Sequence, residues 1–408
     1  MSAAWQWQDA ACFQSCSAST QQRAAQWLAD APALQQKLVA LAAEQPLLHT
    51  ASDATMLQHI VQHAAQLAQH SQQLVVVGTG GASLGAQALC ALSADPTRVR
   101  FLENCDPETV ARFMQLPCEH TAWLIISKSG ETVETLAAAL SLIGTHGPAL
   151  ASRLMVITAN SDSTLGQLAK QQHWPILTHP ARLGGRFSVF SVVGLLPCAY
   201  AGLDIMAIAQ AAQKMLQQLL QQPDVTLWRH ASWIAATMAE KPQQLLMAYA
   251  DRLRPATQWW KQLWAESLGK QGRGQTPITA IGSIDQHSQL QLYLDGPHDK
   301  LVTLWLPDAA GHGPILPTMT LPGLHYLGGH TMGDVMQATA EATVKTLTAT
   351  GVPLRVLRGE LSPASMAEWM VARMLETLAV SVLIAVDPFS QPAVEEGKKL
   401  ARAALGAA

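Results

Sequence analysis

The sequence predicts an α/β protein made of two doubly wound domains, each with a parallel β-sheet covered by helices on both faces. Short β-branched and apolar runs alternate with helical segments of ten or more residues, a pattern typical of βαβ units. This alternation occurs twice along the chain. The runs are apolar almost throughout, as expected for strands that are buried on both faces.

The elements are expected in a simple order. Residues 19–45 carry apolar side chains at helical spacing and predict helix. The strands of the first domain are expected at Leu74–Val77, Val99–Leu102, Ala122–Ser127, Leu154–Thr158 and Pro175–Leu177. Those of the second are expected at Gln244–Ala248, Ile278–Ile281, Val302–Leu306 and Leu354–Leu357, with helices near 257–268, 332–349 and 362–385.

These elements divide the chain into four parts. We expect an N-terminal helical segment (1–45), a first domain (46–222), a second domain (223–390) and a C-terminal helical tail (391–408). The linker between the domains is expected near Gln222–Asp224, in the sequence QQPD. The last helix, roughly Ala393 to Leu405, is expected to pack on one of the domains.

The composition excludes several classes of protein. Hydrophobic residues make up 49% of the chain and charged residues 13%, the opposite of a disordered protein. The net charge of -3 and the lack of a basic run argue against a nucleic-acid partner. We find neither a secretory start nor an apolar stretch long enough to span a bilayer, so we expect a cytoplasmic protein without a membrane partner. Six scattered cysteines are expected to be reduced thiols.

One loop combines hydroxyl groups with a glycine. The expected strand Ala122–Ser127 runs into Ser127-Lys128-Ser129-Gly130-Glu131-Thr132, and a helix follows. Free backbone N–H groups at the N-terminus of a helix favour an anion, and ligands of open α/β sheets bind at the carboxyl ends of strands. Ser and Thr are also common helix caps. The loop alone fits an anion site and an ordinary cap equally well.

Two further turns are rich in glycine. Gly78–Gly85 follows the first strand, but a dinucleotide fingerprint G-x-G-x-x-G would need its third glycine at Ser83. A nucleotide-binding oxidoreductase is therefore disfavoured. In the second turn, Gly184 and Gly185 precede Arg186, which can project toward an oxyanion or lie in a surface loop.

The densest polar stretch follows a tryptophan-rich helix. It contains Gln262, Glu266 and Lys270, and Asp285-Gln286-His287-Ser288 comes shortly after. A carboxylate on such a helix must be desolvated or paired, and either state can prepare it for proton transfer. Taken singly, Glu266 also fits a solvated helix charge, His287 a core histidine and Lys398 a solvated tail lysine.

In combination, these segments resemble the glucose-6-phosphate isomerase family over residues 74 to about 400. The resemblance is carried by Gly78–Gly85, Ser127–Thr132, GGRFSVFSVVGLLP at 184–197, ESLGK at 266–270, DQHS at 285–288 and QPAVEEGK at 391–398. It implies two sugar isomerase domains of α/β/α type, a hexose 6-phosphate substrate, and neither a metal nor an organic cofactor. It also implies a homodimer in which each site takes His287 from the neighbouring subunit.

The resemblance assigns roles to individual residues. Glu266 is the implied base, Arg186 faces the intermediate, and His287 and Lys398 serve ring opening. The implied substrate-binding residues are Gly81, Ser83, Ser127, Lys128, Ser129, Thr132, Gly185, Gln262 and Gln391. Such a set suits an aldose–ketose isomerase that interconverts glucose 6-phosphate and fructose 6-phosphate in glycolysis and gluconeogenesis: a lone carboxylate moves the proton, and a guanidinium stabilises the enediolate.

The chain departs from the family pattern at two positions, and two other functions compete. Ala82 stands where the family usually has serine, and Ser390 where aspartate usually precedes the glutamine. An isomerase with broader sugar choice, including mannose 6-phosphate, would use the same base and loop. A non-catalytic sugar-phosphate sensor would keep the loop and lose the base, whereas Glu266 is present within its motif.

Overall fold

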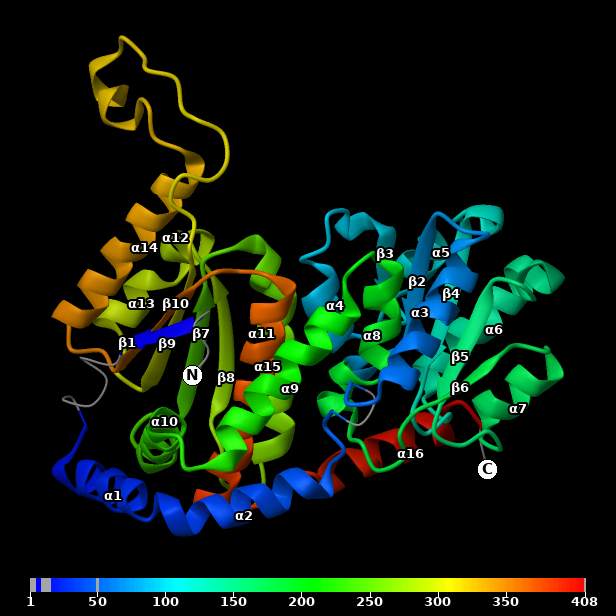
Figure 1. Ribbon diagram of the computed structural model, residues 1–408, viewed down its shortest axis with the longest axis horizontal. Coiled ribbons are helices and arrows are strands. Elements are labelled where there is room, and N and C mark those ends of the chain that lie inside the picture. Colours follow the sequence, from blue (N-terminus) through cyan, green and yellow to red (C-terminus); the bar gives the residue numbers. More distant parts are fainter. Residues whose placement is uncertain (1–4, 9–15, 49–50, 407–408) are drawn as a thin grey trace.

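The computed structural model describes residues 5–8, 16–48 and 51–406 of the chain, and it contains two five-stranded sheets (Figure 1). The first sheet has the order β3-β2-β4-β5-β6 and is parallel. Its strands are β2 (Gln73–Val77), β3 (Val99–Leu102), β4 (Thr121–Ile126), β5 (Leu154–Thr158) and β6 (Ile176–Thr178). The second has the order β1-β10-β9-β7-β8, from β1 (Trp5–Gln8), β7 (Gln243–Ala248), β8 (Thr276–Ile281), β9 (Lys300–Pro307) and β10 (Leu354–Gly359).

Helices connect and cover both sheets, which confirms the predicted fold class. Before the second sheet come α1 (Ala18–Ala29), α2 (Ala31–Glu44), α3 (Ala54–Ala68), α4 (Leu84–Cys90), α5 (Pro107–Met114), α6 (Val133–His146), α7 (Thr164–Gln171), α8 (Val192–Tyr200), α9 (Ile205–Gln221) and α10 (Val225–Thr237). Within and after it come α11 (Arg254–Leu268), α12 (Ile284–Ser288), α13 (Leu290–Asp295), α14 (Met332–Ala349), α15 (Pro363–Leu383) and α16 (Glu395–Ala404). Strands β2–β6 precede Gln222–Asp224 and β7–β10 follow it, and on that basis we propose the domain boundaries 46–222 and 223–390.

The central strands are largely apolar because each sheet is buried on two sides. In β2, Val75 and Val77 belong to one apolar cluster, which includes residues of α6 and α7. Leu74 and Val76, which point the other way, belong to a second cluster that includes residues of α3 and α8. Successive side chains of a strand point to opposite faces, so a strand covered on both faces favours a nearly continuous apolar run.

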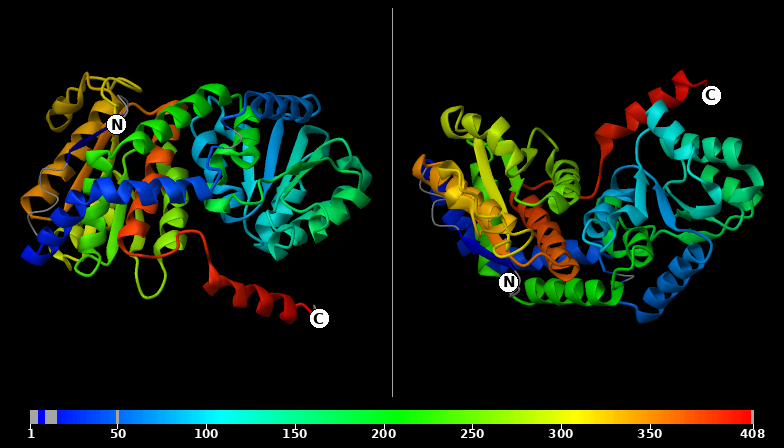
Figure 2. Two further views of the ribbon diagram at one scale, coloured as in Figure 1. Left: turned by 60° about the horizontal axis from the view of Figure 1, so that its bottom comes forward. Right: turned by 90° about the horizontal axis from the view of Figure 1, so that it is seen from above.

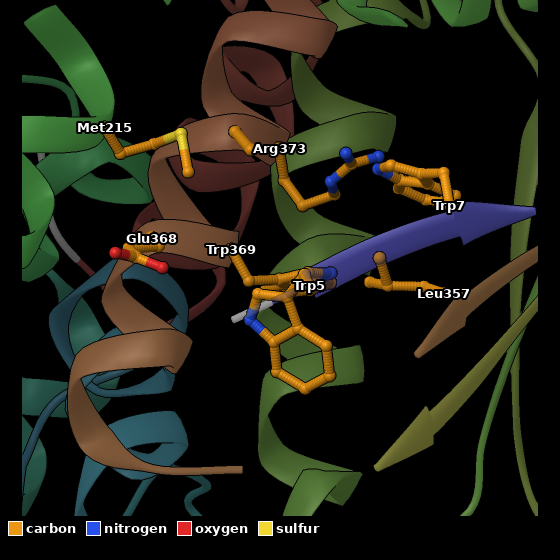
Figure 3. A pocket seen from close by; sticks show the side chains of 8 residues that line it. Trp5, Trp7, Met215, Leu357, Glu368, Trp369 and Arg373 are labelled. Carbon is orange, nitrogen blue, oxygen red and sulfur yellow. The ribbon is translucent and has the colours of Figure 1, made fainter. Parts of the chain in front are cut away.

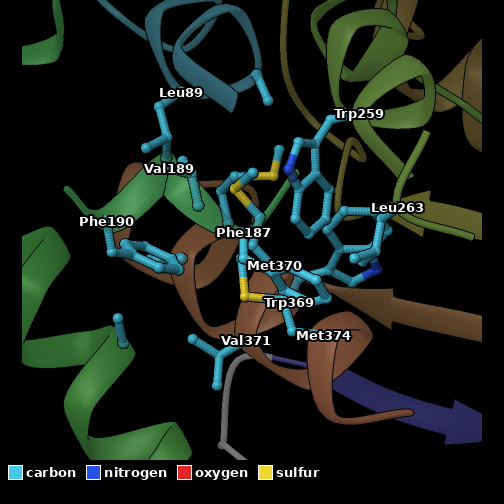
Figure 4. Close-up of a cluster of buried hydrophobic side chains, with 14 of the residues drawn as sticks. Leu89, Phe187, Val189, Phe190, Trp259, Leu263, Trp369, Met370, Val371 and Met374 are labelled. Carbon is cyan, nitrogen blue, oxygen red and sulfur yellow. The ribbon is translucent and has the colours of Figure 1, made fainter. Parts of the chain in front are cut away.

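One large core joins the two halves of the molecule. In Figure 4, Phe187, Val189 and Phe190 from the segment before α8 meet Trp259 of α11 and Trp369 of α15. All five side chains are buried. The two halves therefore share one apolar core, and burial of large apolar side chains, each worth roughly 1.5–3 kcal/mol, stabilises the junction where their segments meet.

The strand β1 corrects the expectation of helix alone for residues 1–45. It pairs antiparallel with β10 and so covers an edge of the second sheet that would otherwise expose unpaired backbone groups. Two tryptophans alternate with two glutamines along it, which is the period of a strand. Four residues are too few to show that period against the helical residues that follow.

The aromatic side chains of β1 anchor it to the second domain (Figure 3). Trp5 donates from its indole N–H to the carbonyl of Ser365, at 2.8 Å. The ring of Trp7 lies 5.1 Å from the guanidinium carbon of Arg355 and 5.0 Å from that of Arg373. Such cation–π contacts gain strength where the groups are shielded from water, so a four-residue strand is enough to close the sheet edge.

Three features at the periphery add to the two helix-covered sheets. The helix expected over 19–45 is two helices, because the chain turns at Asp30 and Pro32 starts α2. Residues 308–331, between β9 and α14, project from the second domain as an arm (Figure 1). The tail helix α16 reaches across to the first domain (Figure 2). Among the described residues, no helix is long and apolar enough to cross a bilayer.

Candidate active site

The loop from Ser127 to Thr132, called the Ser127 loop below, lies at the carboxyl end of β4. The hydroxyls of Ser127 and Thr132 are 2.9 Å apart, and Ser127 Oγ accepts from the N–H of Gly130 at 3.1 Å. Gly130 has φ 69°, and a Cβ there would lie 1.9 Å from Ser163 Oγ, so the position requires glycine. Ser129 Oγ accepts from the N–H of Glu131 at 3.1 Å.

Thr132 occupies the N-cap position of α6, yet its side chain makes no capping hydrogen bond. Its hydroxyl is turned toward Ser127 instead. The interpretation of this loop as an ordinary helix cap is therefore disfavoured. The arrangement leaves the first turn of α6 open to an anion, which the helix dipole would stabilise.

One basic group, Lys128, belongs to this loop, and another, His179, lies near it. Lys128 is half-buried, and burial lowers the pKa of its ammonium group. His179, which follows β6, is buried, and burial lowers its pKa to about 4. Its Nδ1 lies 2.9 Å from the carbonyl of Pro180. At neutral pH the imidazole of His179 is therefore uncharged, near the side chain of Lys128.

The glycine turn that follows β2, Gly78–Ser83, connects this loop to the second domain. Gly81 packs on Gly185 so closely that a Cβ on Gly81 would lie 2.3 Å from the carbonyl carbon of Gly185. A Cβ on Gly80, which has φ 56°, would lie 2.8 Å from Nε2 of Gln262. Ser83 is buried and its hydroxyl donates to Glu103 at 2.5 Å. The glycines therefore allow three segments to meet, and the hydroxyl of Ser83 is already in use.

Arg186 is buried at the centre of this meeting point. Its Nε donates to Ser267 Oγ at 2.8 Å, its Nη1 to Glu266 Oε2 at 3.2 Å, and its Nη2 to the carbonyl of Pro388. Burial lowers the pKa of the guanidinium and the carboxylate of Glu266 opposes that shift. An arginine remains charged even so, and its planar group is held at three points.

Glu266 receives hydrogen bonds from three side chains. Besides Arg186, Gln391 donates to Oε2 at 2.6 Å, and Gln262, one helical turn earlier on α11, donates to Oε1 at 3.0 Å. The side chain of Glu266 is 32% exposed, so the carboxylate is fixed in orientation and still reachable. A fixed, reachable carboxylate beside a buried cation can accept a proton while charge develops nearby.

Three groups at this site were given no role from the sequence. Ser267 and Lys270 belong to the segment ESLGK, which carries part of the family resemblance. Their membership of that segment was the sequence signal that could have identified them. Lys270 Nζ donates to the carbonyls of Glu266 and Ser267, both at 2.9 Å, and so closes the end of α11. The carbonyl of Pro388 acts through the backbone and leaves no sequence signal.

Two residues expected in the site make no described contact with Glu266. His287 is exposed on α12, beyond the carboxyl end of β8, whereas Glu266 precedes the start of that strand. Six residues at about 3.3 Å each make β8 roughly 16–20 Å long. Lys398 lies on α16 and pairs with Glu395 at 2.7 Å, with both side chains exposed. Within the described ranges, no group of three or more His, Cys, Asp and Glu could hold a metal ion.

The sequence and the fold have known relatives. A profile described as phosphoglucose isomerase matches residues 58–285. A glucose-6-phosphate isomerase of Rubrobacter xylanophilus is 35% identical over 358 residues, which cover 81% of this chain and 82% of that one. The chain belongs to the phosphoglucose isomerase family. A second relative of the same name, from Thermus thermophilus, is 34% identical over 82% of this chain and 84% of its own length.

Solved structures agree with this family at the level of the fold. A hypothetical protein from Thermus thermophilus superposes with a TM-score of 0.89 and 29% identity, over 98% of this chain and 99% of that one. A glucose-6-phosphate isomerase from Chlamydia trachomatis gives a TM-score of 0.75 at 17% identity, over 93% and 86% of the two chains. This chain thus shares its overall fold with these solved structures.

Proposed function

We propose that this chain interconverts glucose 6-phosphate and fructose 6-phosphate through an enediolate, without a metal or an organic cofactor. One observation carries the proposal: the carboxylate of Glu266 pairs with the buried guanidinium of Arg186 at 3.2 Å. The glycine turn places this pair next to the Ser127 loop. A base, a fixed cation and an anion site in one continuous region meet the needs of a phosphosugar isomerase.

The pair of Glu266 and Arg186 supplies the proton transfer. Glu266 takes the proton from carbon 2 of the open-chain aldose and returns it to carbon 1, which needs a single base on one face of the sugar. Negative charge grows on oxygen in the intermediate, and an N–H of Arg186 not used in its three contacts can face it. Removing one such donor typically costs about 10²–10³ in turnover.

The Ser127 loop would hold the phosphate and leave the chemistry to the other residues. Its hydroxyls, the first turn of α6 and the half-buried Lys128 offer donors and charge to a dianion. Such an anchor fixes the position of the reacting carbons relative to the base, and orientation of this kind can contribute several kcal/mol to catalysis. Ser129 and Gly185 complete the proposed binding set.

The ring-opening step would need a second copy of the chain. His287 lies about a strand length from the Glu266 of its own chain, so we propose that it serves the site of a partner in a homodimer. The projecting arm supports this, because Ile315 and Tyr326 are each 72% exposed and Leu321 is 61% exposed. Apolar side chains gathered on such a segment are typical of a protein interface. Lys398 would supply the second polar group for ring opening.

The activity is tested with the purified protein in a coupled assay that starts from fructose 6-phosphate and contains EDTA. We expect glucose 6-phosphate to form at the same rate with and without the chelator. Loss of the rate with EDTA would refute metal-free catalysis, and absence of any conversion would favour a sensor. Mannose 6-phosphate as the product would show a broader sugar choice.

The free cysteines in the described part of the chain agree with the cytoplasm as the compartment.

The shared site is tested by mixing two inactive variants. Glu266→Gln and His287→Ala disable the same site from different copies, so a mixed dimer regains one intact site. We expect up to about a quarter of wild-type activity after subunit exchange, since half of the dimers are mixed and each has one working site. Mixing Glu266→Gln with Gln262→Ala, which alter one chain's share of a site, serves as the control. A lack of recovery in the first mixture would show that His287 acts within its own chain or not at all.

A further inference from the structure

The tail helix α16 is attached to the rest of the molecule by few contacts. None of its side chains is buried, and Figure 2 shows it as a separate rod beside the first domain. The described side-chain hydrogen bonds that join it to that domain come from Arg402, whose Nη2 donates to the carbonyl of Glu131 at 2.5 Å and lies 3.5 Å from its Oε2. The orientation of α16 therefore depends strongly on one arginine.

The anchor of this arginine, Glu131, is part of the Ser127 loop, and its side chain is held by two hydrogen bonds. The carboxylate of Glu131 accepts from the backbone N–H of Thr164 at 2.8 Å and from its hydroxyl at 2.9 Å, at the start of α7. Because these bonds hold the Glu131 side chain, Arg402 grips a fixed part of the loop. A change in the loop around a bound phosphate would be transmitted to α16 through the same carbonyl.

The position of Arg402 along the helix determines where Lys398 points. Residues four apart lie on one face of a helix, so Arg402 and Lys398 face the same side. The chain before the helix is held at its other end, where Gln391 donates to Glu266 at 2.6 Å. Lys398 thus lies between one contact at the base and one at the loop. Without Arg402, α16 could rotate about its axis and turn Lys398 away from the site.

We propose that Arg402 is a positioning residue that clamps α16 onto the Ser127 loop and thereby directs Lys398 at the sugar, so that seating of the phosphate and placement of the lysine are coupled. The proposal rests on the proposed function, in which the loop binds phosphate and Lys398 takes part in ring opening. Lys398 rests against Glu395 without substrate and would exchange that partner for the sugar.

The kinetic test is a double-mutant cycle on Arg402→Ala and Lys398→Ala. We expect Arg402→Ala to lower kcat at least about 10-fold, and the double variant to be no slower than Lys398→Ala, because the arginine acts through the lysine. Lys399→Ala, which removes a neighbouring charge on α16, should stay within about 2-fold of wild type. The proposal would be overturned if the losses in kcat of the two single variants multiplied in the double variant, or if Arg402→Ala kept wild-type turnover.

Two further measurements separate positioning from a general defect. The affinity for a five-carbon aldonic acid 5-phosphate, an open-chain analogue that needs no ring opening, should change less than about 3-fold in Arg402→Ala. Amide hydrogen exchange of residues 395–404 should slow when inorganic phosphate binds to the wild type and should not respond in Arg402→Ala. If phosphate slowed this exchange in Arg402→Ala as much as in the wild type, the coupling would be overturned. This result does not depend on turnover, so it is distinguishable from failure of the isomerase assay.

Discussion

The carboxyl ends of the two sheets present opposite chemistry. At the first sheet, the Ser127 loop and the glycine turn offer hydroxyls, helix-terminal N–H groups and Lys128. At the second sheet, a pocket of about 600 Å³ opens beside the carboxyl ends of the strands. Its lining includes Asp251, Asp308 and Glu360 as well as Arg252. An anion is favoured at the first edge and repelled by the carboxylates of the second.

The difference shows that the fold alone does not place the ligand. Both sheets have parallel strands and a pocket or loop at the expected edge, yet the loop residues decide what can bind there. The second domain contributes to the first edge in another way, through α11 and the segment around Gln391, which bring Glu266 to the glycine turn. One domain provides the anchor and the other the base.

Replacement of the base should separate the two contributions most clearly. Glu266→Gln keeps the size and shape of the side chain and removes the proton acceptor, so kcat should fall at least about 10²-fold. The dissociation constant for inorganic phosphate should stay within about 3-fold, because the anchor belongs to the first sheet. Steady-state kinetics and calorimetry check both numbers. Near-normal turnover would show that Glu266 is not the base.

The carboxyl edge of the first sheet should also be the part of the molecule that loses stability in acid. His179 has its pKa lowered to about 4 by burial, so between pH 6.5 and 4 the unfolded chain binds a proton that the native chain does not. Stability is unaffected above pH 6.5 and decreases as the pH falls through this window, by about 3 kcal/mol at most. His179→Gln should remove that decrease, as urea titrations at pH 4, 5, 6 and 7 would show. The exposed His59→Gln is the control, and equal acid sensitivity in wild type and His179→Gln would contradict the assignment.

The contact between the glycine turn and the segment Gly184–Arg186, also in the first domain, should tolerate no side chain at Gly81. Gly81→Ala would put a Cβ 2.3 Å from the carbonyl carbon of Gly185 and 2.7 Å from the nitrogen of Arg186. We expect about 1–3 kcal/mol lower stability and about 10-fold lower kcat, because the guanidinium would shift. Gly184→Ala is a matched control, since its Cβ would lie 3.5 Å from the nearest atom. Equal effects of the two variants would mean that the close contact is not needed.

Much of the fold could be predicted because the strands are nearly continuous apolar runs, and burial on two faces requires that pattern locally. The strand β1 escaped prediction since its four residues show their period only when β10 lies beside them. The division of the N-terminal helix near Asp30 depends on Pro32 alone, in the first turn of α2. The apolar spacing on either side of this proline continues as in one long helix.

The candidate site was predicted residue by residue but not as an arrangement. Arg186 and Glu266 lie 80 positions apart, and no local pattern states that they pair. The packing of the two domains brings them together, and that packing depends on the aromatic core around Trp259. The location of His287 at the far end of β8 likewise follows from topology rather than from its own neighbours in sequence.

The hydroxyls of the Ser127 loop should affect binding more than turnover. Ser127→Ala and Thr132→Ala each remove a donor expected to contact the phosphate, and hydrogen bonds to charged groups are worth about 1.5–3 kcal/mol. The KM for fructose 6-phosphate should therefore rise about 10-fold or more, with kcat within about 3-fold of wild type. Ser141→Ala, at a half-buried position of α6 where the hydroxyl donates to the carbonyl of Ala137, should leave both constants unchanged. A drop in kcat at constant KM would mean that the loop takes part in the chemistry.

The smallest effect is expected at the second edge. Asp308 is exposed beside the pocket there, and Asp308→Asn removes one carboxylate without a change of shape. If the first edge alone binds the phosphate, the affinity for inorganic phosphate should change less than about 2-fold, since exposed charges more than about 8–10 Å apart are screened at physiological salt. Calorimetric titration of the wild type and Asp308→Asn at about 0.15 M salt measures this directly. A second phosphate equivalent bound by the variant would break the comparison, because it would show that only a carboxylate keeps the second sheet from being an anion site as well.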